Sequence, residues 1–294
     1  MLMYPEFLIP ILIVRLLLAT VCAIGNALVI ATIFSIKRND RTILHYTRLS
    51  LATADFGAAL SIQAYSIHSL VDISDLIDSN TWTHFWIDYS LIYFFLCIAC
   101  YNICLLAVQR LIAVKYPYRY TCITNRKLAV CIVITWSLGI PAALSKPYYY
   151  IWNGSNLGNH LFLVYQMLIP FIVNLLCTVA MLVAYKVYTK DGMLQDTTDT
   201  VVTNRRRNTK IFKMAMFITI GHTLTCLPRI VFKAFWFTEE PEDHDFITTV
   251  IYYIVTTVYW LNGIANLIIY SLVDDEFMKY AKSLTVKLLA PLRN

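Results

Sequence analysis

Charged side chains are scarce in this sequence. Asp, Glu, Lys and Arg make up 14% of its 294 residues and hydrophobic residues make up 59%, with a mean hydropathy of +0.61. A soluble domain has about a quarter of its residues charged, so too few charges are present here to cover a globule in water. Most of the surface must therefore face lipid. At roughly 20 residues for each crossing, the chain has room for about seven membrane-spanning helices with short loops, and we expect no separate soluble domain.

Cysteine is missing from every segment that we place on the outer side of the membrane. Seven of the eight cysteines fall inside apolar runs, and Cys122 lies in a basic loop. The sequence therefore predicts no disulfide framework. Cys97, Cys100 and Cys104 recur at helical spacing, but small buried cysteines commonly pack in this way, so we predict no metal site there.

Seven apolar runs are long enough to cross a bilayer as helices. The first has no basic segment before it and is longer than the core of a signal peptide, so we interpret it as a span. The predicted spans are 8–36, 43–71, 86–114, 127–145, 161–188, 211–237 and 246–273, followed by an amphipathic helix at about 274–289. The sequence thus predicts an all-α membrane protein, a seven-transmembrane helix bundle that forms a single domain over residues 1–294.

Basic residues gather on one side of this predicted topology. All but four of the 24 Lys and Arg residues lie on the side of the odd-numbered connections and the C-terminal tail, and more than half of the 18 acidic residues lie on the other side. The positive-inside rule then places the N-terminus outside and the C-terminus inside. The sequon Asn153-Gly154-Ser155 falls in an outward loop, so Asn153 is a predicted glycosylation site. The net charge of +6 is a topology signal in a chain that contacts the lipid bilayer, and it indicates no nucleic acid.

Polar side chains interrupt the apolar runs at defined depths. They are Asn26, Asp55, Asn102, His222, Asn262 and Asn266. Polar groups in lipid need partners, and an ionisable one marks a functional site. Asp55 lies well inside the second span, and asparagines of the first and seventh spans are predicted at matching depth. A hydrated sodium ion or a proton on Asp55 would each satisfy the carboxylate.

Arg110 ends the third span at its inner side. An arginine there is costly unless it reaches water, a headgroup or a partner. On this segment alone, a side chain that extends to the headgroups is the favoured interpretation.

The order of these residues resembles the rhodopsin-like (class A) G protein-coupled receptors, of which the chain is identified as a divergent member. The matching residues are Gly25-Asn26, Leu51-Ala52-Thr53-Ala54-Asp55, Arg110, Trp136, Pro170, Pro228 and Asn266-Leu267-Ile268-Ile269-Tyr270. Each motif is weak alone, but together they occur in the right order on seven spans. The resemblance extends through Phe277 and so covers nearly the whole chain.

The resemblance implies a receptor, not an enzyme, in the plasma membrane, which binds an extracellular ligand and opens a cytoplasmic cleft for a heterotrimeric G protein. It implies a coupling and activation set of Gln109, Arg110, Tyr270 and Lys213. It also implies a polar network that can hold a sodium ion, formed by Asp55, Asn26, Asn262 and Asn266. No other cofactor or metal is expected.

The sequence departs from the family pattern at several of these positions. Gln109 replaces the acid that usually precedes the arginine, and no acid stands at the base of the sixth span, so we predict elevated basal activity. Leu267 replaces the proline of the last motif and should leave the seventh span straighter. Ala99 and Gly263 stand where hydroxyls often line the sodium site, which weakens that expectation.

The ligand is less constrained. Ile92 stands where amine receptors carry an aspartate, and the seventh span has no lysine for a retinal Schiff base. Arg229 and Lys233 share one helical face and could grip a carboxylate or phosphate; alternatively, Lys233 extends outward and both pair with acids of the 239–245 loop. By the resemblance, the other cavity residues are Tyr89, Ile92, Tyr93, Gln166, Tyr252, Thr256 and Trp260.

A short peptide is the favoured ligand, ahead of a small anionic lipid or metabolite. The acidic outer loops at 72–78 and 239–245 could attract a cationic peptide, although ordinary solvated loops have the same composition. From another class, an ion- or proton-coupled transporter would use Asp55, His222 and Arg110, but it would be expected to show internal repeats or paired helix breaks, and none are evident. The six scattered histidines do not favour an intramembrane enzyme.

Overall fold

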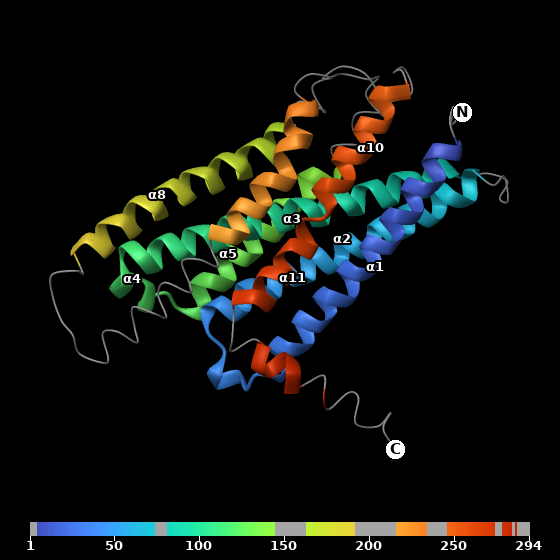
Figure 1. Cartoon of the computed structure of the whole chain (residues 1–294). Helices are drawn as coiled ribbons and strands as arrows, with labels where there is room; N and C mark the ends of the chain where they lie inside the picture. Colours follow the sequence, from blue (N-terminus) through green and yellow to red (C-terminus); the bar gives the residue numbers. More distant parts are fainter. Residues whose placement is uncertain are drawn as a thin grey trace.

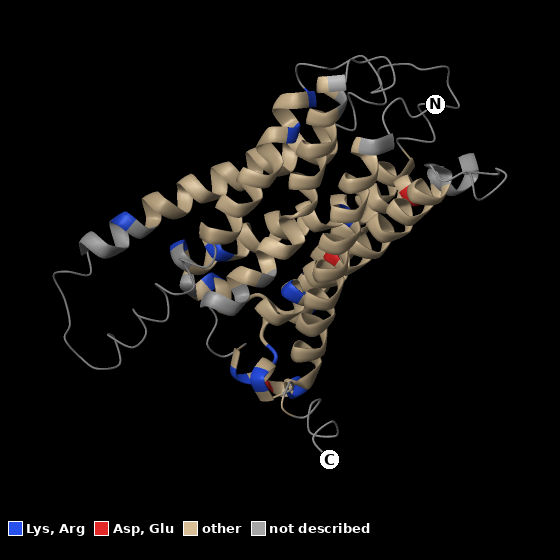
Figure 2. Ribbon diagram, turned by 45° about the vertical axis from the view of Figure 1, so that its right-hand side comes forward, with Lys and Arg blue, Asp and Glu red and all other residues tan. Residues whose placement is uncertain are grey.

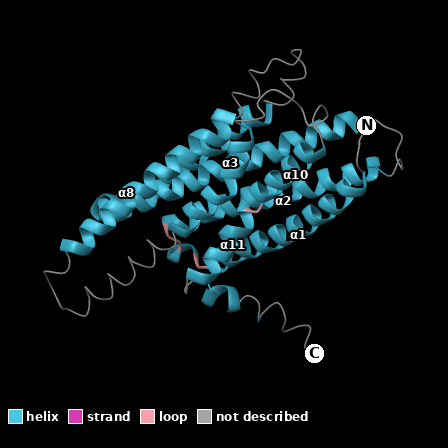
Figure 3. Ribbon diagram, turned by 45° about the horizontal axis from the view of Figure 1, so that its top comes forward, coloured by secondary structure: helices cyan, strands magenta, loops and turns pink. Residues whose placement is uncertain are grey.

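The computed structural model describes residues 5–73, 81–144, 163–191, 216–233, 246–273, 278–283 and 286. Within these ranges all regular secondary structure is helical (Figure 3), which confirms the all-α prediction. The sequon at Asn153, residues 74–78 of the first acidic outer loop and the whole of the second one at 239–245 lie outside the described residues.

The helices follow the apolar runs closely along the chain. The first half contains α1 (Pro5–Ser35), η1 (Arg38–Asp40), α2 (Ile43–Ile73), α3 (Thr81–Lys115), α4 (Pro117–Thr121) and α5 (Asn125–Ser137), which resumes as helix at 139–144. The second half contains η2 (Leu163–Leu168), a π-helical turn that runs into α8 (Ile169–Asp191), then helical residues 216–233, α10 (Phe246–Trp260) and α11 (Asn262–Val273).

The long helices lie side by side as a bundle (Figure 1). α3 runs through its middle, with α2 and then α1 packed on one side and α8 on the other. The start of α1 and residues 278–283 lie at opposite ends of the bundle, as an odd number of crossings requires. Figure 2 shows the described basic residues mostly at the end that holds residues 278–283, opposite the start of α1. This distribution agrees with the inward assignment of that end.

The outer faces of the bundle are apolar enough to contact lipid. Leu17, Leu176 and Leu224 are each more than half exposed. Four described stretches are by length and composition alone able to cross a membrane: Phe7–Ser35, Ile87–Ala113, Asn125–Leu144 and Val164–Ala184. The other long helices are more polar, as α2 is, or are shorter segments.

The core of the inner half joins residues that are far apart in the sequence. Val29, Ile33, Leu51 and Ile98 form one buried cluster, and Met278 and Ala281 of the predicted amphipathic helix pack against it. Trp136 also packs here, and its indole Nε1 donates a hydrogen bond of 3.0 Å to Ser50 Oγ. α1, α2, α3, α5 and the segment after the seventh span thus share one core.

The seventh span is interrupted at Leu261, whereas α11 runs without a break through Leu267. That Leu267 leaves the span straighter stays a prediction. α10 ends at Trp260 and α11 begins at Asn262, because the Leu261 amide donates to the Val258 carbonyl at 3.1 Å in a tighter turn. The break precedes Gly263, where a Cβ atom would lie 2.7 Å from Cys22 Sγ and 3.2 Å from Asp55 Cγ. Just after the break, the backbone therefore approaches side chains of α1 and α2 closely.

Candidate ligand site and activation residues

A small cavity opens between α1, α3, residues 216–233 and α10. Its volume is about 10 Å³, which holds about one water molecule. Its lining consists of two arginines, four tyrosines, a tryptophan, a threonine and an isoleucine: Arg15, Arg229, Tyr89, Tyr93, Tyr252, Tyr253, Trp260, Thr256 and Ile92. We call this the arginine cavity.

The lining includes every ligand-site residue predicted from the sequence except Lys233 and Gln166. Gln166 is fully buried in the π-helical turn and its Nε2 donates to the Tyr93 carbonyl at 3.3 Å, so it supports the wall from behind. The Lys233 ammonium lies 5.7 Å from the centre of the Tyr252 ring, near the cavity without lining it. Binding at these residues stays a prediction.

Arg15, which sequence reasoning did not assign to the site, is the main addition. It is 2% exposed and reaches from α1 to α10. Its Nε donates to Thr257 Oγ1 at 2.8 Å and its Nη2 donates to the Tyr253 carbonyl at 2.8 Å. The guanidinium also lies over the rings of Tyr253 and Trp260, at 4.7 and 4.6 Å from their centres. Arg15 therefore connects the first and seventh spans inside the bundle.

Arg229 lines the same cavity, but it has far fewer contacts that offset the cost of burying its charge. It is also 2% exposed, and its guanidinium lies 5.0 Å from the centre of the Tyr259 ring. Within the described residues, its Nε and Nη1 have no hydrogen-bond partner. No described carboxylate lies within 4.0 Å of either arginine, and Asp88, which precedes the cavity residue Tyr89, is paired with His68 at 2.5 Å.

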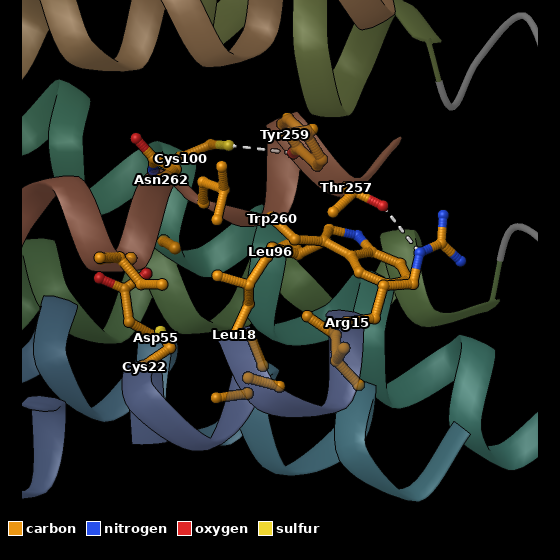
Figure 4. Close-up of a pocket in the computed structure, with 18 residues that line it drawn as sticks. Arg15, Leu18, Cys22, Asp55, Leu96, Cys100, Thr257, Tyr259, Trp260 and Asn262 are labelled. Carbon is orange, nitrogen blue, oxygen red and sulfur yellow. Dashed lines mark hydrogen bonds between the residues drawn. The ribbon is translucent and has the colours of Figure 1, made fainter. Parts of the chain in front are cut away.

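A second cavity extends from Arg15 towards the middle of the bundle (Figure 4). Its volume is about 30 Å³, and Arg15 and Trp260 line it as well as the arginine cavity. Figure 4 places Arg15 and Thr257 at one end of this second cavity, and Asp55 with Cys22 at the other. The stacked Arg15 and Trp260 side chains thus form a wall common to both spaces. We call the second space the Asp55 cavity.

The predicted polar network is only partly joined by hydrogen bonds. Asn266 Nδ2 donates to Asp55 Oδ2 at 3.0 Å, linking α11 to α2. Asn262 lines the Asp55 cavity, and its Oδ1 has no partner among the described residues. Asn26 instead turns back on its own helix, with Nδ2 donating to the Cys22 carbonyl at 3.0 Å.

The residues around Asp55 fit a sodium ion in part. The Asp55 carboxylate supplies the charge, and Asn262 Oδ1 is a buried oxygen that needs a partner. Ala99 and Gly263 line the same cavity and contribute no side-chain oxygen, so water would have to complete the coordination. Asp55 and Asn262 are the residues that would hold the ion.

Comparison with known families decides the class of protein. The model of the family described as 7 transmembrane receptor (rhodopsin family) matches residues 25–270, which is most of the chain. The chain belongs to the rhodopsin family of seven-transmembrane receptors. It is therefore a multi-pass membrane protein and a non-enzymatic receptor that signals through G proteins, which confirms the predicted class and the seven-transmembrane fold. This family assignment replaces the alternative prediction of an ion- or proton-coupled transporter.

At the inner end of the receptor, the Gln109 side chain is bound to the neighbouring helix α2. Thr47 Oγ1 lies 2.8 Å from Gln109 Nε2 and 3.1 Å from its Oε1, so the amide is bound to α2. Arg110 is buried at 3% exposure. Tyr270 belongs to α11, but its side chain, like the whole of Lys213, lies outside the described residues. The coupling roles of these residues stay predictions.

Proposed function

We propose that this receptor lies in the plasma membrane and converts the binding of an extracellular ligand with an anionic group into activation of a heterotrimeric G protein. The observation that carries the anionic group is the arginine cavity, whose lining includes two buried guanidiniums. Removing a cation from water is costly unless a counter-charge or several hydrogen bonds replace its hydration. A ligand anion would supply both.

A short peptide that presents a carboxylate is the ligand class we favour. The arginine cavity accommodates a small group only, so the rest of the ligand must extend out of it. The sequence predicts acidic loops at 72–78 and 239–245 on the outer side of the membrane. Those acids would attract basic side chains of the same peptide. A small anionic lipid or metabolite is the second candidate, because the lining of the cavity is largely aromatic and would accept an apolar body.

At the inner end, we propose that the inactive state lacks the ion pair that an acid at position 109 would make with Arg110. Its neighbour Gln109 is neutral and hydrogen-bonded to Thr47, so it supplies no ion pair across the turn. The inactive state lacks that stabilisation, and a smaller free-energy gap between the two states raises the basal population of the active one. Elevated basal signalling follows. Basal nucleotide exchange no higher than in cells without the receptor would contradict it.

The function is tested by nucleotide exchange on a panel of purified G proteins with the full-length receptor in lipid nanodiscs. Peptides with a free C-terminal carboxylate, the same peptides amidated, and anionic lipids form the ligand library. We expect a free-acid peptide to stimulate exchange, its amide to be at least about tenfold weaker, and Arg229→Ala to abolish the response. Arg41→Ala is the matched control, since Arg41 hydrogen-bonds carbonyls at the inner end of α1. Unchanged potency at Arg229→Ala would remove Arg229 from the ligand site.

A further inference from the structure

We propose that the arginine cavity is a built site for one acceptor-only monoanion of about carboxylate size, and that Arg15 is its second cation. This inference deepens the proposed function and rests on it for the identification of the anion as part of the ligand. Sequence resemblance placed Arg229 near the ligand but gave no such role to the first span.

The cavity collects hydrogen-bond donors that have no partner. Within the described residues, Arg229 Nε, Arg229 Nη1, Thr256 Oγ1 and Trp260 Nε1 are all buried without a hydrogen bond, and all three residues line this one small space. Guanidinium and indole nitrogens can only donate, and a threonine hydroxyl can do so. Leaving such groups unmet costs about 1–3 kcal/mol each, so an occupant that only accepts would satisfy several at once.

The two positive charges that line the cavity favour an anion over a neutral hydrogen-bond acceptor. Arg15 and Arg229 face the same space, and no described carboxylate is within salt-bridge distance of either. Two like charges in a medium of low dielectric constant repel each other, so each arginine raises the cost of burying the other. A negative charge between them would be attracted to both, and these two attractions would offset the repulsion. Water, which is neutral and also donates, would do this less well.

The size of the cavity limits the anion. A volume of about 10 Å³ admits one water-sized group without rearrangement. A carboxylate or a chloride ion approaches that size, whereas a phosphate monoester would need the aromatic walls to separate. The shared chemistry is therefore a small monoanion, supplied either by a ligand carboxylate or by a free ion.

Arg15 is suited to add specificity because its geometry is already fixed. Its two hydrogen bonds to α10 and its stacking on Trp260 hold the guanidinium beside the cavity without using a carboxylate. A preorganised charge loses little conformational entropy on binding. Arg229 offers open donor sites, and Arg15 offers fixed charge.

The test uses the full-length receptor in nanodiscs at constant sodium concentration, with sodium acetate or sodium chloride exchanged against sodium methanesulfonate, whose tetrahedral sulfonate group is bulkier than a carboxylate and too large for the cavity. The readout is the unfolding temperature as a function of anion concentration. We expect acetate to raise it, and the half-effective concentration to increase about tenfold or more in Arg15→Met and in Arg229→Met, since one charge-assisted contact is lost in each. Arg41→Met should respond as the wild type does.

Each result bears on one part of the proposal. Equal stabilisation by methanesulfonate and acetate would overturn the site, and loss of the acetate response in Arg229→Met but not in Arg15→Met would overturn the role of Arg15. A response to chloride without one to acetate would overturn the carboxylate. If Arg15→Met does not fold, Arg15→Lys keeps the charge without the planar fork and should weaken acetate binding; an unchanged response would count against Arg15.

Basal nucleotide exchange measured on the same samples separates this inference from the proposed function. Acetate binding without any exchange would leave the site standing and refute the coupling. Exchange without acetate binding would refute the site alone.

Discussion

Replacing Arg229 by methionine is expected to stabilise the receptor when no small anion is present. The side chain is 2% exposed, and two of its nitrogens have no hydrogen-bond partner within the described residues. Each such donor costs about 1–3 kcal/mol. The compensating contact is the Tyr259 ring at 5.0 Å, worth about 0.5–2 kcal/mol. Methionine keeps much of the aliphatic packing and removes the charge. The stability gained by removing the unsatisfied donors should therefore exceed the stability lost with the Tyr259 contact.

Arg15→Met is the matched comparison and should shift stability in the other direction. Arg15 is also 2% exposed, so the cost of burying a guanidinium nearly cancels between the two variants. Arg15, however, makes two hydrogen bonds of 2.8 Å and stacks on two rings. Hydrogen bonds from a charged donor contribute about 1.5–3 kcal/mol each, so the two variants should differ by about 3 kcal/mol or more. That difference corresponds to roughly 6 °C in the unfolding temperature.

Thermal unfolding with a thiol-reactive fluorescent dye measures this difference. All eight cysteines are free, and six of them are buried, so their reaction reports loss of the fold. Cys122 and Cys131 are exposed and should be replaced by serine in every variant to lower the background. If Arg229→Met unfolds at or below the temperature of the parent, or if the two variants shift it alike, the argument from unsatisfied donors is wrong.

Three further predictions concern the middle and the inner end of the bundle. Gln109→Glu places a carboxylate beside Arg110 and should lower ligand-free nucleotide exchange about threefold, since about 0.6 kcal/mol suffices for that shift; an unchanged rate would show that this position does not hold the inactive state. Gly263→Ala puts a Cβ atom 2.7 Å from Cys22 Sγ and should destabilise by about 1–3 kcal/mol, with much of the loss restored by Cys22→Ala; thermal unfolding of the single and double variants decides this. Replacing sodium by N-methylglucamine should lower the unfolding temperature of the parent but not of Asp55→Asn, and an equal response of both would argue against an ion at Asp55.

Much of the architecture can be predicted from the sequence, because in a membrane protein the depth of a residue in the bilayer largely decides which groups can surround it. An apolar run long enough to cross the bilayer must be a helix, and a polar residue within it must find a partner at its own depth. The depths of Asp55 and Asn266 were sufficient to predict that they belong together, and the structure joins them by a hydrogen bond. Depth alone did not show that Asn26 would turn to its own helix.

Arg15 was missed because its position near the start of the first span equally suits a side chain that extends to the headgroups. A signal was present in the spacing. Arg15, Cys22 and Asn26 are separated by seven and four residues, so all three lie on one face of a helix. That face is buried, whereas the neighbouring Val14 and Leu17 are exposed. A cation on the same stripe as an interior asparagine predicts an inward arginine.

The break at Leu261 lies at a point of the seventh span that no proline marks. Proline is the commonest cause of a sharp bend, so its absence at Leu267 predicts a straighter span, and α11 runs without a break through that residue. The backbone is drawn close to α1 and α2 at Gly263, where no other residue would fit beside Cys22 and Asp55 without displacement. That contact involves three spans, and no single segment of sequence encodes it.

The break in the seventh span lies next to the wall that separates the arginine cavity from the Asp55 cavity. Trp260 is the last residue of α10, and it forms with Arg15 the wall between the arginine cavity and the Asp55 cavity. Arg15 is held there by Thr257 and Tyr253, both one turn or two before the break. An anion bound beside the fixed Arg15 guanidinium leaves those two hydrogen bonds and the stack on Trp260 in place. Since the same stack closes the space beside Asp55, any shift of Arg15 changes the surroundings of both the ligand site and the polar network.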